Sequence, residues 1–166
     1  MYPKHRIYYD NLPSYFMEFD IYDKENDIFL DTKTRKDFVK RFLNGNLKIN
    51  SCAVLKEGSF DNINDILSLI GKSNYITNNF KNNLLKTLIS LDYTQEEIND
   101  ILTQSNDSTF MEGIYIKVED NGQVVNRLKF VRNNFTQIKI DTNTKWLNRT
   151  IIPNKLALDG DFDYKY

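Results

Sequence analysis

The 166-residue sequence predicts an α+β fold with mostly antiparallel sheets. Aromatic and β-branched runs typical of strands lie in the first third of the chain and after residue 105, whereas the middle shows the apolar spacing of helices. Between two of the later runs, Asp120-Asn121-Gly122 contains the Asn-Gly pair typical of a β-hairpin turn. We therefore expect one domain of mostly antiparallel strands with a helical insertion at about residues 62–104.

The first third of the chain is expected to run strand, turn, strand and helix. Residues 15–22 form an aromatic-rich run that suits a strand, and the polar residues 23–27 suit a turn. A short strand is expected at 28–30, after which Asp31 or Thr32 is well placed to cap a helix.

Composition and cysteine content limit the class of protein. Hydrophobic residues make up 40% and charged residues 27% of the chain, which is the balance of a globular protein, and the net charge of -1 provides no general attraction to nucleic acid. A single cysteine, Cys52, excludes an internal disulfide; it lies in a strand expected at 52–55, where we expect a buried and unreactive thiol. No apolar run has the length of a membrane span, and no signal peptide is recognisable, so a cytoplasmic protein is expected.

Three helices are expected in the middle of the chain. Apolar residues at the spacing of one helix face occur within 63–70 and again within 84–88. The third helix is predicted by a capping box, in which Thr94 is followed three positions later by Glu97. After these helices, the hairpin is expected to pair residues 112–119 with 123–132, and a further strand is expected at 137–140.

The predicted hairpin carries charged residues suited to a nucleotide. Glu112 opens one strand, and Arg127 and Lys129 lie two positions apart on the other, so both cations are expected on one face. A carboxylate can hold a divalent metal while cations neutralise phosphate, which is the chemistry of a Mg-nucleotide site. The alternative interpretation is an ordinary solvated face of a sheet.

A second candidate is the pair Phe19-Asp20 in the first aromatic run. The ring of Phe19 can stack on a nucleobase, and the carboxylate of Asp20 can orient a neighbouring group. The alternative is a core phenylalanine followed by an aspartate at a strand end.

Several segments form a series in the chain, namely Lys-His-Arg-Ile-Tyr-Tyr-Asp-Asn-Leu-Pro at 4–13, Tyr-Phe-Met-Glu-Phe-Asp-Ile-Tyr-Asp at 15–23, Phe-Leu at 29–30, Glu-Gly-Ile-Tyr-Ile-Lys at 112–117 and Arg-Leu-Lys-Phe-Val-Arg at 127–132. The first three resemble nucleotidyltransferase motifs III and IIIa of the ATP-dependent RNA ligase family, and the last two resemble its motifs IV and V. Trp146 and residues 152–156 are also similar to bacterial and phage members. The resemblance covers nearly all of residues 1–166 and implies the C-terminal half of an adenylation domain.

The resemblance implies covalent nucleotidyl transfer in three steps. In this family a lysine attacks the α-phosphate of ATP, the AMP passes to the 5′-phosphate of a broken RNA, and the 3′-OH of the other end displaces AMP. ATP and Mg²⁺ are therefore the implied cofactors, and RNA with 5′-phosphate and 3′-OH ends is the implied partner.

The resemblance also implies roles for individual residues: Phe19 stacks on adenine, Asp20 supports that site, Glu112 serves the metal, and Lys117, Arg127 and Lys129 contact phosphate. Arg127 departs from the family pattern, which usually has lysine at that position. Arginine keeps the charge but changes the geometry of phosphate binding.

A larger departure is the absence of the nucleophile motif. The family lysine lies in Lys-x-Asp-Gly, upstream of the strand that carries Phe19, and the only Asp-Gly here is Asp159-Gly160, with Ala157 in place of the lysine. We therefore expect a truncated chain that lacks its catalytic lysine and is inactive alone. Such a half domain is expected to need a separately encoded N-terminal half or to self-associate.

Two other interpretations remain open. The chain could be a non-catalytic nucleotide- or RNA-binding module derived from a ligase. Kinship to DNA ligases or capping enzymes is the third possibility, but those proteins carry an OB-fold of roughly a hundred residues after motif V. Only 34 residues (166 minus 132) follow Arg132, which favours the RNA ligase interpretation.

Overall fold

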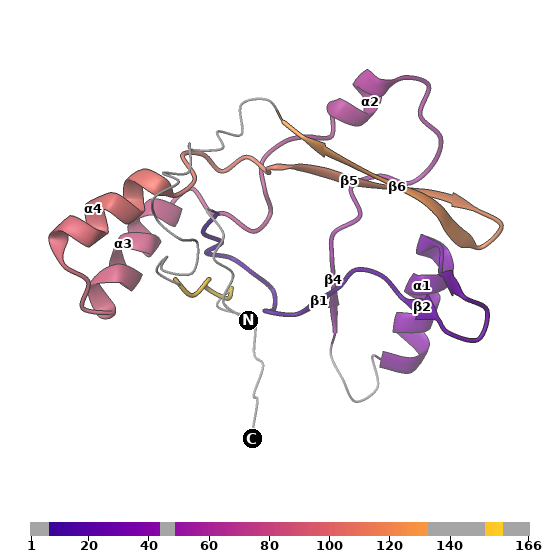
Figure 1. Cartoon of the computed structure of the whole chain (residues 1–166), viewed down its shortest axis with the longest axis horizontal. Helices are drawn as coiled ribbons and strands as arrows, with labels where there is room; N and C mark the ends of the chain where they lie inside the picture. The colour runs from indigo at the N-terminus through magenta and orange to yellow at the C-terminus, as the bar shows by residue number, and fades with distance from the viewer. Residues whose placement is uncertain (1–6, 44–48, 133–151, 158–166) are drawn as a thin grey trace. The chain divides into compact units, whose positions relative to one another are not determined.

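The chain forms two compact units in a computed structural model (Figure 1). The model describes residues 7–43, 49–132 and 152–157. Unit 1 draws on residues 1–15, 71–111 and 133–166, and unit 2 on residues 16–70 and 112–132. The described residues combine helices with small, mostly antiparallel sheets, which confirms the α+β prediction.

In unit 2, the aromatic run expected to be one strand is divided. β1 (Met17–Glu18) pairs in parallel with β4 (Asn50–Ser51), and β2 (Tyr22–Asp23) pairs antiparallel with β3 (Ile28–Phe29). Between β1 and β2 the carbonyl of Phe19 accepts hydrogen bonds from side chains instead of joining a ladder. The prediction of a continuous strand was therefore wrong, because tertiary polar contacts replace strand pairing there. The expected turn at 23–27 and the strand at 28–29 are confirmed.

The strand expected at 52–55 was also wrong. Strand pairing ends at Ser51, and Val54 and Leu55 are exposed, so this apolar run does not enter a core. Cys52 is partly buried, and burial, followed by the negative charge of Glu18, raises the pKa of its thiol.

A single helix follows β3. α1 (Thr32–Phe38) begins after Asp31, whose carboxylate accepts a 2.8 Å hydrogen bond from the Thr34 amide, and it continues as a π-helix, η1 (Val39–Leu43). Of the two caps that the sequence allowed, the structure therefore uses Asp31. Among the side chains of residues 32–41 in this segment, Thr32, Arg35 and Val39 are buried.

The predicted hairpin is present as β5 (Gly113–Asp120) and β6 (Gln123–Val131) (Figure 1). Asn121 and Gly122 at its tip have φ angles of 49° and 83°, the left-handed values required by a tight hairpin turn. The tip also contacts the segment between β3 and α1, since Leu30 bridges Gln123 and the Asp31 amide donates to the Gly122 carbonyl over 3.0 Å.

The helix predicted within 63–70 is short. α2 (Ile63–Leu67) is capped by the side chain of Asn62, and it has no buried residue. The apolar spacing continues to Ile70, but the helix ends at Leu67. No core packs against its apolar side chains to stabilise further turns.

In unit 1, α3 (Phe80–Ser90) and α4 (Gln95–Gln104) confirm the other two predicted helices, and they lie side by side (Figure 1). Thr94 and Glu97 form the predicted capping box. The core of this unit contains Tyr8, Leu84, Leu88 and Ile98. None of the helices in the described ranges has the length and apolar character needed to cross a bilayer. The strand expected at 137–140 and Trp146 lie outside the described residues.

Candidate functional site

The candidate site lies in unit 2, on one face of the β5–β6 hairpin. Lys117 is opposite Arg127 in the register, and Tyr115 is opposite Lys129. Side chains of directly opposed residues, and of residues two apart on a strand, lie on the same face of a sheet. The register therefore confirms that Arg127 and Lys129 share a face, and it adds Lys117 to them.

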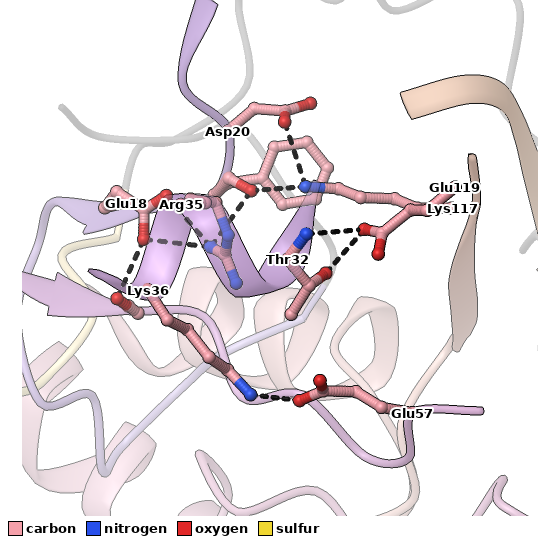
Figure 2. Close-up of polar contacts among 10 residues, drawn as sticks. Glu18, Asp20, Thr32, Arg35, Lys36, Glu57, Lys117 and Glu119 are labelled. Carbon is pink, nitrogen blue, oxygen red and sulfur yellow. Dashed lines mark hydrogen bonds and ion pairs between the residues drawn. The ribbon is translucent and has the colours of Figure 1, made fainter. Parts of the chain in front are cut away.

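Asp20 lies at the centre of this group. One carboxylate oxygen accepts a hydrogen bond from Lys117 Nζ, and the other accepts one from Arg127 Nη2, each over 3.0 Å. The Asp20 and Lys117 side chains are mostly buried, at 13% and 12% exposure, so this ion pair is only weakly screened by water (Figure 2). Asp20 therefore holds two of the predicted phosphate-binding cations together.

Phe19 lies next to the same cations. Lys117 Nζ is 4.6 Å from the centroid of its ring and donates a 2.7 Å hydrogen bond to its carbonyl. The ring of Tyr115 meets it edge-on, with centroids 4.9 Å apart and an angle of 65° between the planes. Because Phe19 remains 41% exposed, part of its aromatic surface is open to a ligand.

The sequence did not reveal a third part of the site, formed by Arg35, Glu18 and Ser51. Arg35 Nη1 donates to both Glu18 carboxylate oxygens over 2.9 Å and to the Phe19 carbonyl over 3.2 Å (Figure 2). Ser51 Oγ donates to Glu18 over 2.8 Å. The only available sequence signal was that Arg35 falls between Thr32 and Val39 on one helical stripe, where a charged residue needs a buried partner.

Two further contacts connect the hairpin to neighbouring elements of unit 2. The Glu119 carboxylate accepts hydrogen bonds from the Thr32 amide over 2.9 Å and from its hydroxyl over 2.6 Å (Figure 2). The Arg127 guanidinium lies 4.1 Å from the centroid of the Phe29 ring. These contacts tie α1 and β3 to the strands that carry the cations.

Glu112 pairs with Lys129, whereas Asp20 pairs with the other two cations of the hairpin. Its carboxylate is 3.2 Å from Lys129 Nζ, and both side chains are accessible, at 35% and 63% exposure. No group of three or more His, Cys, Asp or Glu side chains that could hold a metal occurs among the described residues. Mg²⁺ usually keeps several waters and needs only one or two protein carboxylates beside phosphate oxygens, so Glu112 fits a metal that arrives with a nucleotide.

The charges of the site are balanced. Lys117, Arg127 and Lys129 pair with Asp20 and Glu112, Arg35 pairs with Glu18, and the Glu119 carboxylate binds Thr32, which gives +4 - 4 = 0. The most exposed cation is Lys129, which makes it the most accessible to a phosphate group.

A model of the family described as RNA ligase matches residues 1–131. This chain belongs to the RNA ligase family. The matched range contains Phe19, Asp20, Glu112 and all three cations. A search of curated proteins and a search of solved structures each returned no match.

Family membership supports an RNA ligase-like function. It also suggests the use of ATP and an RNA substrate. The arrangement of the described residues is compatible with such a ligand, because the partly exposed ring of Phe19 lies beside Lys117, one of three cations on one face of the hairpin.

Proposed function

We propose that this chain supplies the nucleotide-binding part of an ATP-dependent RNA ligase, and that residues 1–166 form a partial nucleotidyltransferase domain with motifs III, IIIa, IV and V. The observation that carries the proposal is the convergence of Lys117 and Arg127 on Asp20, beside the exposed ring of Phe19. A base stacked on that ring would place its phosphates near Lys117, Arg127 and the exposed Lys129.

Each residue then has a defined task. Phe19 stacks on adenine, and Asp20 keeps two cations in place until phosphate oxygens share them. Lys129 pairs with the accessible Glu112 and is itself 63% exposed, so it contacts phosphate most readily. Glu112 holds Mg²⁺ together with phosphate oxygens and water, and the metal supplies polarisation of the phosphoryl group when bound.

The proposed ligase role requires a lysine from elsewhere. The 166 residues contain no Lys-x-Asp-Gly, so we propose that they form no lysyl-AMP alone. A polypeptide carrying that motif would supply the nucleophile, and RNA with 5′-phosphate and 3′-OH ends would be the substrate. A cytoplasmic location is part of the same proposal.

Nucleotide titration tests the binding role. A fluorescent ATP analogue, titrated with Mg²⁺ present, should bind the wild-type chain, and Lys129→Gln should weaken binding about tenfold, which is about 1.4 kcal/mol. Lys36→Gln is the matched control, because Lys36 is an exposed lysine of unit 2 that pairs with Glu57, outside the cation cluster. Absence of binding by the wild-type chain, or equal weakening by both substitutions, would contradict the proposal.

A labelling experiment tests the catalytic part. With α-labelled ATP, the chain alone should acquire no covalent label that survives denaturation and alkali, whereas a mixture with a polypeptide that carries Lys-x-Asp-Gly should acquire such a label on that polypeptide. Because the nucleophile motif is absent here, a non-catalytic nucleotide- or RNA-binding module is the second candidate. ATP or RNA binding without any label in the mixture would favour that module.

A further inference from the structure

The buried contact between α1 and the segment 18–20 has a feature that stability alone does not explain. The side chains of Arg35 and Glu18 are only 3% and 8% exposed. Within the described part of the chain, Arg35 Nε is also buried without a hydrogen-bond partner. A buried ion pair costs desolvation, and an unpaired buried donor adds to that cost, so a well-packed apolar pair would serve stability at least as well.

The geometry of this contact points to the residues next to it. A single guanidinium nitrogen, Arg35 Nη1, binds the Glu18 carboxylate and the carbonyl of Phe19. The same carbonyl accepts from Lys117 Nζ, which also binds Asp20. The main chain at Phe19 is therefore held from α1 on one side and from β5 on the other. Loss of the Arg35 contacts would release the Phe19 main chain from α1 and leave it held by Lys117 of β5.

We infer that Arg35 is a positioning residue for adenosine recognition, acting through Glu18 and the Phe19 carbonyl. This inference rests on the proposed function, since it assigns Phe19 to the base. It predicts a separation between two parts of the ligand. Loss of Arg35 should weaken the hold on the base, whereas Lys129 keeps its hold on phosphate because its ion pair is with Glu112, outside the segment 18–20.

The test compares ATP with inorganic tripolyphosphate, both titrated calorimetrically with Mg²⁺ into the full chain. Arg35→Gln should weaken ATP at least tenfold and change tripolyphosphate less than twofold. Arg35→Lys keeps a cationic donor and should recover most of the ATP affinity. Ser51→Ala removes one donor to Glu18 from an exposed position and should weaken ATP by a few fold in the same direction.

A second readout requires no nucleotide. Amide hydrogen exchange of residues 17–21 should be faster in Arg35→Gln than in wild type, whereas exchange in β5, β6, α3 and α4 stays unchanged. Unchanged exchange at 17–21, or equal losses of ATP and tripolyphosphate affinity, would overturn the positioning role. If the wild-type chain bound no ATP but the exchange result held, the proposed function would fall and Arg35 would remain only the residue that orders this segment.

Discussion

Asp20 shows how one carboxylate can organise a site at the scale of single residues. Its two oxygens bind Lys117 and Arg127 separately, so the two cations are held at a fixed spacing on the hairpin face. Charge-assisted hydrogen bonds of this kind are stronger than neutral ones. A phosphate group that enters must share these cations with Asp20, whereas Lys129 is paired with the more exposed Glu112.

The exposed ring of Phe19 leads to a prediction about nucleotide binding. Phe19→Ala should weaken binding of the fluorescent ATP analogue by at least fivefold, because stacking of one base is worth about 1–3 kcal/mol. Fluorescence anisotropy titration measures the change. Phe16→Ala is the control, since Phe16 is a more exposed phenylalanine of the same aromatic run, at 64% exposure. Equal losses for both substitutions would show that Phe19 does not stack on the base.

At the scale of elements, the end of the hairpin depends on a close approach of the two strands. A Cβ atom at Gly113 would lie 1.9 Å from the Phe130 carbonyl oxygen, so no other residue fits there without a shift of the backbone. This explains why a glycine follows Glu112. Without a side chain at position 113, β6 can approach β5 closely at the residue next to the candidate metal ligand.

Gly113→Ala should therefore lower the free energy of unfolding by about 1–3 kcal/mol, the usual cost of overpacking. Urea unfolding followed by circular dichroism measures it. Gly71→Ala is the matched control, because a Cβ at Gly71 would meet nothing within 4 Å. A similar stability for both variants would mean that the strands separate freely at this point.

The start of α1 gives a pH-dependent prediction at the same scale. The hydrogen bonds from the Thr34 side chain and then its amide lower the pKa of Asp31. Asp31→Ala should cost about 1 kcal/mol at pH 7, the usual value of an N-cap. Since the folded pKa is lowered, the charged group stabilises the fold above the ordinary carboxyl pKa of about 3.9, and this stabilisation is lost as the pH falls through the folded value.

Urea unfolding of wild type and Asp31→Ala measures the difference in their free energies of unfolding. The measurement is made at pH 7, at pH 5, and at several values from pH 4 downwards. The gap should be constant between pH 7 and 5 and shrink at lower pH. Asp31→Asn retains an oxygen for the Thr34 amide and should remain close to wild type at pH 7. A gap that stays the same at every pH would contradict the charged cap.

At the scale of the whole molecule, the two units are stabilised differently in the described part of the chain. Both clusters of buried apolar residues lie in unit 1, around Leu84 and Leu88 and around Phe80. Unit 2 instead has the ion pairs of Asp20 and Glu18, and it leaves apolar side chains of the hairpin exposed, including Val125 and Leu128. Exposed apolar sheet surface is typical of an interaction face.

We therefore expect the chain to self-associate through the hairpin. Sedimentation velocity should show association that increases with concentration, and Leu128→Gln should weaken it about tenfold, since Leu128 is 52% exposed on the face opposite the cations. Ile89→Gln is the control, because Ile89 is similarly exposed but lies on α3 in unit 1. A chain that stays monomeric at all concentrations would contradict this expectation.

The sequence by itself determined the features that depend on neighbouring residues in the chain. Asn121-Gly122 specified the hairpin turn, Thr94 and Glu97 specified the start of α4, and the two-residue period placed Arg127 and Lys129 on one face. The series of motifs also indicated the RNA ligase family, which the family match over residues 1–131 confirms.

Only the tertiary structure decided which distant groups meet. The break in the strand expected at 15–22 arises because Arg35 and Lys117, 16 and 98 residues away from Phe19, bind its carbonyl. The pairing of Asp20 with both cations, and of Arg35 with Glu18, likewise joins elements that no local spacing connects. Periodicity reports which side of an element a residue occupies, but a hydrogen bond between elements depends on how the chain returns in three dimensions.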